Sequence, residues 1–304
     1  MNNAIDKEAL RVLFSELFPN GIDVDSFDAE VLCRQTDGVG ASCGERLRQL
    51  AIWYCDEYVP MSLEKWALVD HLYIEAAQRE PASATIHDSM GVSAFEVAQL
   101  LDDEQESQQL LAVAREAFQR ALRLGPNVPN PFYGIGLTYY FYPQRTTEMA
   151  EDTVKAETWF RRALERDREF ARARLYLAHC LHDRAQWQAA LTEYERVDRA
   201  RIAVELHPWR SSSRLDEQIA YCHLKLGHRT RALALFEAAL ARYESYPRTE
   251  LPEDLIEFPD ELVKAATTEL APELCSRMAA CIRQHGWERY YAEDLVCGVS
   301  GAGG

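Results

Sequence analysis

Residues 177–183, with the sequence LAHCLHD, bring together side chains that could bind a transition metal. Imidazole nitrogens, a thiolate and a carboxylate are ligands that zinc, iron or copper take in proteins. His179 and His182 are three positions apart, so on a helix both rings leave the same face, and Asp183 follows directly. A zinc-enzyme helix of the H-E-x-x-H type carries a glutamate between its histidines as the general base, and this segment has none. A metal-dependent enzyme or sensor centred on these three residues is therefore kept as an alternative.

Other sequence signatures of catalysis or nucleotide binding are missing. The chain has no G-x-S-x-G nucleophile elbow, no G-x-x-x-x-G-K-[ST] phosphate loop and no G-x-G-x-x-G motif after a strand. The glycines of YGIG, residues 133–136, suit close helix packing better than phosphate binding. The adjacent carboxylates Glu253 and Asp254 stand in an acidic stretch that predicts no apolar pocket for acid–base chemistry. We therefore expect a non-enzymatic protein without a cofactor.

The composition predicts a soluble, cytoplasmic protein. Of its 304 residues, 47% are hydrophobic and 27% charged, which is the balance of a folded domain and not of a disordered chain. No apolar run is long enough to cross a membrane, and the start MNNAIDKEAL lacks the basic and apolar segments of a secretory signal. The eight cysteines include no C-x-x-C pair, and we expect them to be reduced thiols.

The net charge separates the ends of the chain from its middle. The whole chain carries −16, of which residues 1–110 account for −14, while the arginine-rich residues 111–250 are slightly basic. Binding to phosphates requires a basic surface, so nucleic acid is not expected as a partner. The acidic ends either keep the chain soluble or steer a partner by long-range electrostatics.

Three segments in the middle of the chain repeat one another: 131–164, 171–197 and 213–240. The first predicted helix of each contains a large residue followed by a small one. The second contains an alanine, an aromatic residue four positions later and a small or β-branched residue three beyond. These sets are Ala156, Phe160 and Ala163; Ala190, Tyr194 and Val197; and Ala232, Phe236 and Ala239. Small residues let paired helices approach closely, and the aromatic ring fills the gap to the next hairpin.

An earlier half-repeat contains Ala114, Phe118 and Ala121. We expect its first helix at residues 94–101, with the acidic residues 102–109 as an enlarged turn. The four alanines that begin these sets are 42, 34 and 42 residues apart. The pattern resembles the tetratricopeptide repeat (TPR), a helix–turn–helix of about 34 residues with an A-x3-F pair in its second helix. Over residues 90–243 the resemblance implies an all-α, right-handed solenoid of helical hairpins.

The resemblance also implies a concave groove, lined by the second, fifth, ninth, twelfth and thirteenth positions of each repeat. These positions are held by Tyr133, Leu137, Tyr140 and Phe141; by Arg172, Leu175, His179, His182 and Asp183; and by Arg214, Glu217, Tyr221 and Lys225. The tenth position, where a small packed side chain is expected, is held by Thr138, Cys180 and Cys222. Aromatic rings beside arginine and histidine suit an extended or helical peptide. We therefore predict a scaffold or adaptor with a protein or peptide partner.

Residues 1–58 predict three short helices, which either cap the solenoid or form a module of their own. Their order of helix, FP turn, helix, glycine break and arginine-bearing helix resembles the effector-associated, death-like adaptor modules of bacterial signalling proteins. The matching residues are Leu17, Phe18, Pro19, Gly44 and Arg46. That resemblance implies a place in a signalling or defence assembly. A further alternative is an autoinhibited regulator whose acidic N-terminus occupies the groove.

The remaining segments complete the predicted domain organisation. Residues 59–89 are a connecting helix and loop, with the helix at 61–80, and residues 90–243 are the repeats. An acidic, proline-containing connector is expected at 244–259, capping helices at 260–295 and a glycine-rich flexible tail at 296–304.

Overall fold

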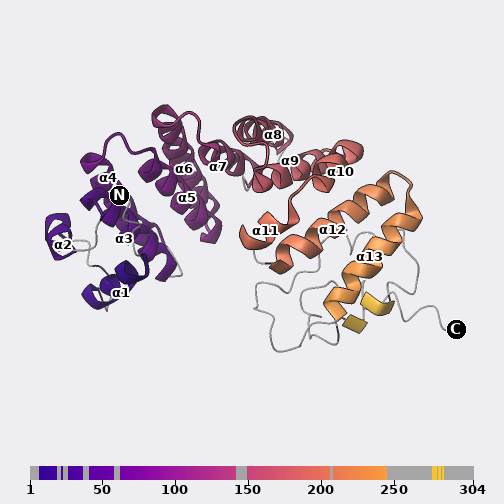
Figure 1. Cartoon of the computed structure of the whole chain (residues 1–304), viewed down its shortest axis with the longest axis horizontal. Helices are drawn as coiled ribbons and strands as arrows, with labels where there is room; N and C mark the ends of the chain where they lie inside the picture. The colour runs from indigo at the N-terminus through magenta and orange to yellow at the C-terminus, as the bar shows by residue number, and fades with distance from the viewer. Residues whose placement is uncertain are drawn as a thin grey trace. The chain divides into compact units, whose positions relative to one another are not determined.

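The computed structural model describes residues 7–18, 22, 27–36, 41–57, 62–141, 149–205, 208–244, 276–278, 280–281 and 283. Over these ranges the chain is helical and contains no strand, which confirms the all-α prediction. The helices are α1 (Lys7–Leu17), α2 (Ala29–Gln35), α3 (Cys43–Glu57), α4 (Leu63–Arg79), α5 (Ala84–Leu100), α6 (Glu104–Leu124), α7 (Pro129–Tyr140), α8 (Met149–Arg166), α9 (Ala171–Asp183), α10 (Trp187–Glu195), α11 (Arg199–Glu205), α12 (Pro208–Lys225) and α13 (Arg229–Glu244). They form two compact units that divide between Phe170 and Ala171 (Figure 1).

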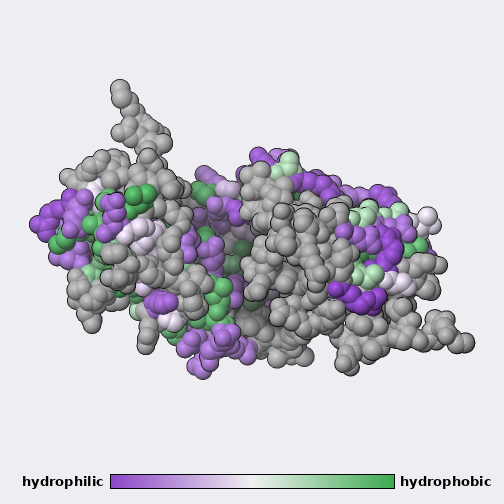
Figure 2. All heavy atoms as spheres, turned by 90° about the horizontal axis from the view of Figure 1, so that it is seen from below, coloured by the Kyte–Doolittle hydropathy of each residue, from purple (hydrophilic) through white to green (hydrophobic). Residues whose placement is uncertain are grey.

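The N-terminal helices bury their apolar faces in the core of the first unit. Phe14 of α1 and Leu47 and Leu50 of α3 are completely buried, and the same core continues through α4 to Ile135 of α7. Some large apolar residues stay exposed, among them Ile74 and Val92. Figure 2 shows hydrophilic and hydrophobic residues side by side on the described surface. The three predicted helices of residues 1–58 and the connecting helix are therefore present. The resemblance of this region to adaptor modules stays a prediction.

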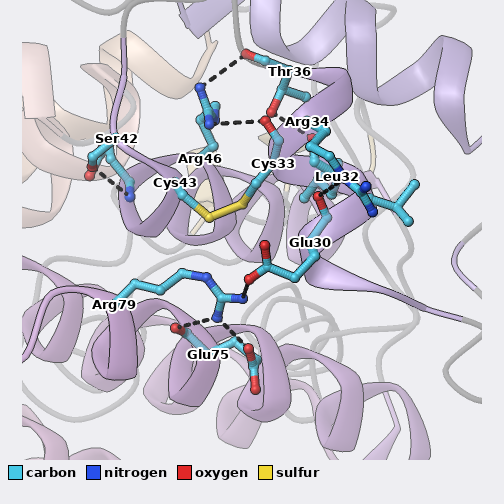
Figure 3. The surroundings of a disulfide bond; sticks show 12 residues. Glu30, Leu32, Cys33, Arg34, Thr36, Ser42, Cys43, Arg46, Glu75 and Arg79 are labelled. Carbon is cyan, nitrogen blue, oxygen red and sulfur yellow. Dashed lines mark hydrogen bonds and ion pairs between the residues drawn. A yellow bond between two sulfur atoms is a disulfide. The ribbon is translucent and has the colours of Figure 1, made fainter.

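Two cysteines of this region correct the prediction of reduced thiols. Cys33 near the end of α2 and Cys43 at the start of α3 form a disulfide, with their Cα atoms 5.4 Å apart (Figure 3). The buried Arg46 guanidinium donates hydrogen bonds to the backbone carbonyls of Cys33 and Thr36, at 3.0 and 3.1 Å, and so joins the end of α2 to α3. The prediction failed because α2 packs against α3 and so brings together cysteines that are ten positions apart.

The structure differs from the prediction for the hairpin of α5 and α6 in two ways: α5 begins earlier, and the turn between the two helices is shorter. α5 begins at Ala84, and the acidic residues 104–109 are not a turn but the start of α6. Asp103 caps α6 by accepting a hydrogen bond from the backbone nitrogen of Glu106 at 2.9 Å. Acidic side chains in a first helical turn are stabilised by the helix dipole. The acidic residues that predict a solvated turn are therefore also a favourable start for a helix.

The predicted aromatic residues fill the space between neighbouring hairpins. Phe118 of α6 is 1% exposed and lies against two glycines, Gly91 on α5 and Gly134 on α7. Phe160 of α8 is completely buried and lies against Gly136 of α7 in the same way. A methyl group at any of these glycines would overlap the ring, so the close approach of α7 to its neighbours depends on their missing side chains. Within this unit, α5 lies beside α6 and α7 beside α8 (Figure 1).

The second unit repeats the arrangement with α9 and α10 and then with α12 and α13. Its paired alanines and aromatic residues are 0 to 1% exposed, namely Ala190 and Tyr194 in α10 and Ala232 and Phe236 in α13. The small residues predicted for the tenth position, Thr138, Cys180 and Cys222, are completely buried. The additional helix α11 stands between the two hairpins and accounts for the longer repeat at this point.

The described part of the C-terminal segment is short. Met278 and Cys281 are buried, and Arg277 forms an ion pair with Glu244 of α13 at 2.7 Å. The predicted connector, the rest of the capping helices, the flexible tail and the loop of residues 142–148 lie outside the described residues. Among the described helices, none is long and apolar enough to cross a membrane.

Candidate functional site

In the second unit, two histidines on α9 contact aromatic residues from α10 and α12. His179, His182, Trp187, Tyr194 and Tyr221 form this group, which we call the aromatic–histidine cluster. His179 and His182 lie one turn apart on α9, as predicted, and contact the same neighbouring helix. Tyr194, the aromatic residue of the α10 pattern, contacts both histidines, and the His182 ring contacts Tyr221 of α12, so predicted groove positions of α9 and α12 lie together.

A chain of hydrogen bonds fixes the outer histidine. Nδ1 of His179 is 2.7 Å from the hydroxyl of Tyr194, and that hydroxyl donates to Oε1 of Gln218 on α12 at 2.6 Å. Because the single hydroxyl hydrogen is directed to Gln218, the hydrogen of the first bond comes from Nδ1, which sets the tautomer of a neutral His179. Three helices are therefore coupled through one tyrosine that is 1% exposed.

The inner histidine is enclosed by rings. His182 is 7% exposed, and its ring centroid lies 5.0 Å from that of Trp187 and 5.5 Å from that of Tyr221. Trp187 and Tyr221 also meet each other edge to face at 5.7 Å. Nε2 of His182 is buried and has no hydrogen-bond partner among the described residues. A buried polar atom without a partner costs free energy, so this nitrogen is a point where a ligand atom would be stabilised.

A cation and a carboxylate border the cluster. The Lys225 ammonium lies 5.0 Å from the centre of the Tyr221 ring, within the range of a cation–π contact. Asp183 follows the histidines, with its Oδ1 3.6 Å from Nδ1 of His182, which is longer than a hydrogen bond. The described residues contain no group of three or more His, Cys, Asp or Glu side chains placed to hold a metal ion. The metal-centred alternative therefore finds no ligand set in the part of the chain that the structure describes.

The end of α9 has an unusual backbone. Ala185 has a positive φ of 57°, which places it in the left-handed region that glycine normally occupies. Its amide donates to the carbonyl of His182 at 2.8 Å, and the amide of Gln186 donates to Leu181 at 2.9 Å. This closure orients Trp187 at the start of α10 toward His182. Gly227, with φ of 80°, has the same place after α12.

The remaining predicted groove residues of the second unit differ in accessibility. Leu175 is 7% exposed and Glu217 is completely buried, whereas Arg172 is half-buried and Lys225 exposed. The side chain of Arg214 lies outside the described residues, although its backbone belongs to α12. In this unit the accessible predicted groove residues are therefore Arg172, His179, Asp183, Tyr221 and Lys225.

The four predicted groove residues of the first unit are on α7 and its end. Tyr133 and Leu137 are each 8% exposed, and the Tyr133 ring packs on Phe170 with a centroid distance of 5.3 Å. Tyr140 and Phe141 are half-buried and contact each other edge to face, with centroids 5.1 Å apart. The first unit therefore has separate ring contacts at these positions, among them Tyr133 with Phe170 and Tyr140 with Phe141.

Sequence reasoning missed two members of the site. Neither Trp187 nor Gln218 is among the predicted groove positions. The signal for Trp187 was its place directly after the turn that ends the histidine helix, where the first residue of the next helix faces back toward α9. Gln218 could not be found in this way, because its role depends on the packing of α12 beside α10.

Comparison with solved structures identifies the fold. A tetratricopeptide repeat protein from Parabacteroides merdae is similar over 97% of this chain and 97% of its own, with a TM-score of 0.50 and 18% sequence identity. The chain has a tetratricopeptide-repeat fold. PilF of Pseudomonas aeruginosa is similar over 79% of this chain and 95% of its own, with a TM-score of 0.48 and 16% identity. The TPR protein YrrB, which has an unusual peptide-binding site, is similar over 70% of this chain and 93% of its own, with a TM-score of 0.45 and 16% identity.

No protein-family model matches the sequence, and no curated protein matches it. The TPR fold is therefore recognisable in the geometry of the helical hairpins and in the A-x3-F pairs. In this chain the two 42-residue spacings coincide with the extra helix α11 and with the long connection between α7 and α8.

Proposed function

We propose that this TPR chain is a non-enzymatic scaffold that binds a protein or peptide partner through the aromatic–histidine cluster. The buried Nε2 of His182, which has no partner among the described residues, is the observation that carries the proposal. It stands inside a group of rings, so a peptide could supply both an apolar side chain and one hydrogen-bonding atom. A place in a signalling or defence assembly rests only on the resemblance of residues 1–58 to adaptor modules.

The accessible chemistry of the cluster favours a particular kind of peptide. Tyr221, Trp187 and His179 are half-buried, so their outer edges can contact an apolar or aromatic side chain. Lys225 is exposed beside Tyr221. Its ammonium group can only donate hydrogen bonds, so its partner on the peptide would be a carboxylate or a carbonyl oxygen. The expected partner segment therefore has an apolar or aromatic residue next to an acidic one.

Selection from a random peptide library on the full-length protein tests this proposal. Peptides that the wild-type protein enriches are measured by fluorescence polarisation against wild type and two variants of the cluster. Tyr221→Ala removes an accessible ring, and we expect about tenfold weaker binding or more, as for an interface hot spot. His182→Phe keeps a ring of similar shape but removes the buried nitrogen, and we expect a loss of similar size if that nitrogen bonds the peptide.

Glu237→Gln on α13 is the matched control, because Glu237 is exposed and makes none of the ring contacts of the cluster. It should leave the dissociation constant unchanged. Thermal unfolding of every variant shows whether the second unit is intact. Peptides that bind Tyr221→Ala and His182→Phe as tightly as wild type would place the binding surface elsewhere and refute the proposal.

A further inference from the structure

A cavity of about 490 Å³ opens between α4, α5 and α6 of the first unit. Its walls include the side chains of Tyr73, Ala77, Met90 and Val113, and Ile74 at its edge is 44% exposed. This volume and this apolar lining are those of a small-molecule site. The cavity is formed by residues of the first unit alone, so it is separate from the aromatic–histidine cluster.

One polar group of the cavity is left without a partner. His87 of α5 lines the cavity, is 5% exposed, and its Nε2 is buried with no hydrogen-bond partner among the described residues. The hydroxyl of Tyr73, by contrast, forms a hydrogen bond of 2.8 Å with the hydroxyl of Ser93. The buried polar group that a ligand could satisfy is therefore the imidazole.

Two arginines of α6 act on this imidazole. Burial lowers the pKa of His87, and the charges of Arg120 and Arg123 on α6 lower it further. Arg120 also lines the cavity, is exposed, and forms no ion pair with any described residue. Glu116, four positions before Arg120 on the same helix, lines the cavity too but does not pair with it in the structure.

The lining also holds two acidic residues, Asp70 on α4 and Glu116 on α6. Asp70 of α4 lines the cavity, and burial raises the pKa of its carboxyl group while the charge of His71 opposes that change. The Arg120 guanidinium, which forms no ion pair with a described residue, is the group on this lining that would stabilise an anionic ligand. The apolar walls suit a hydrocarbon chain or ring.

We propose that this cavity binds a small amphipathic carboxylic acid, with its apolar part between α4, α5 and α6 and its carboxylate at His87 and Arg120. Arg120 forms an ion pair with the carboxylate, and Nε2 of His87 donates a hydrogen bond to it. Methylene groups of the ligand replace water along Ala77, Met90 and Val113. This inference does not depend on the proposed peptide-binding function.

Isothermal titration calorimetry of the full-length protein with octanoate, decanoate and dodecanoate tests the proposal. Each added methylene that enters the cavity should tighten binding by about fourfold, and the gain should stop once the chain outgrows the cavity. The protein carries −16, so long-range electrostatics oppose the binding of these anions, and binding would come from the local site. Decylammonium, with the same chain and the opposite charge, is the probe of head-group selectivity.

Two variants and a control locate the site. Arg120→Gln removes an exposed charge and should weaken decanoate binding by roughly tenfold, the usual size of a charge-assisted hydrogen bond. Arg123→Gln is the control on the same helix, because Arg123 acts on His87 electrostatically but does not line the cavity, and it should change the affinity by less than about threefold. Ala77→Phe places a ring in the cavity and should abolish binding, with circular dichroism used to show that the helices are retained.

Several results would overturn the proposal. Absence of decanoate binding, or an affinity that keeps rising with chain length without a plateau, would exclude a bounded carboxylate site. Equal loss of affinity in the Arg120 and Arg123 variants would exclude a direct ion pair. Decylammonium binding that is tighter than that of decanoate and is abolished by Ala77→Phe would show that the cavity takes cations instead.

Discussion

Replacing Gly134 by alanine should destabilise the first unit, although alanine is the better helix former. Helix propensity alone predicts a gain of about 1 kcal/mol for glycine to alanine inside a helix. A methyl carbon at this position, however, would lie 2.5 Å from Cε1 of Phe118 and would overlap two further ring atoms. Carbon atoms attract one another best at about 3.5–4.0 Å, so the ring or α7 would have to move by about 1 Å.

The Phe118 ring has nowhere to go. On its other side it faces Gly91 of α5, where a methyl carbon would also lie 2.7 Å from the ring, and its exposed fraction is only 1%. Overpacking of a well-filled core costs about 1–3 kcal/mol. After the gain in propensity is subtracted, we expect Gly134→Ala to lower the free energy of unfolding by up to about 2 kcal/mol.

Urea unfolding followed by circular dichroism measures the change, and hydrogen exchange mass spectrometry locates it. Exchange should quicken in α5, α6 and α7 and stay unchanged in α12 and α13, because the overlap lies in the first unit. The companion variant Phe118→Leu removes the atoms that the new methyl group meets. The double variant should therefore lose about 1 kcal/mol less free energy of unfolding than the sum of the losses in the two single variants. A stabilised Gly134→Ala, or strict additivity with Phe118→Leu, would refute the packing argument.

Three further predictions follow from local features. Replacing both Cys33 and Cys43 by serine should cost about 2–3 kcal/mol, because the disulfide closes a loop of about ten residues, and faster hydrogen exchange in α2 and α3 than in α5 checks this. Ala185→Gly should stabilise the second unit by about 1 kcal/mol and Gly227→Ala should destabilise it by a similar amount, since both positions have positive φ; urea midpoints that move in the same direction would contradict this. The pKa of His87 lies below its ordinary value of 6.5, so as the pH falls the unfolded state binds a proton before the folded state does. The free energy of unfolding should therefore decrease as the pH drops below about 6.5. The urea midpoint should fall less between about pH 7.5 and 5.5 in His87→Gln than in wild type.

The hairpin pattern could be predicted from the sequence because it is a local steric rule. Alanine at one position and an aromatic residue four later define which face of a helix is small and which side chain spans the gap. Phe118, Phe160, Tyr194 and Phe236 are all 0 to 1% exposed, as that rule requires. The start of α6 was missed because acidic residues suit both a solvated turn and the first turn of a helix, and Asp103 as the capping residue decides between them.

The disulfide and the cavity could not be predicted, because each depends on how separate helices approach. Cys33 and Cys43 have no spacing motif, and only the packing of α2 against α3 brings their Cα atoms to 5.4 Å. His87 was not singled out from the sequence. Its importance arises from α4 and α6, which enclose it beside Arg120 and leave its Nε2 without a partner among the described residues.

The histidine pair shows how a repeat changes the meaning of residues that could do chemistry. On α9 alone, His179 and His182 are placed as two ligands of one metal, since both leave the same face. The hairpin then places Tyr194 beside them, and it takes up Nδ1 of His179 in a hydrogen bond, while rings from α10 and α12 enclose His182. One imidazole is thereby held in position, and the other is buried with one nitrogen that has no partner among the described residues. Two histidines alone do not make a metal site, and the described residues contain no group of three or more His, Cys, Asp or Glu side chains placed to hold a metal ion.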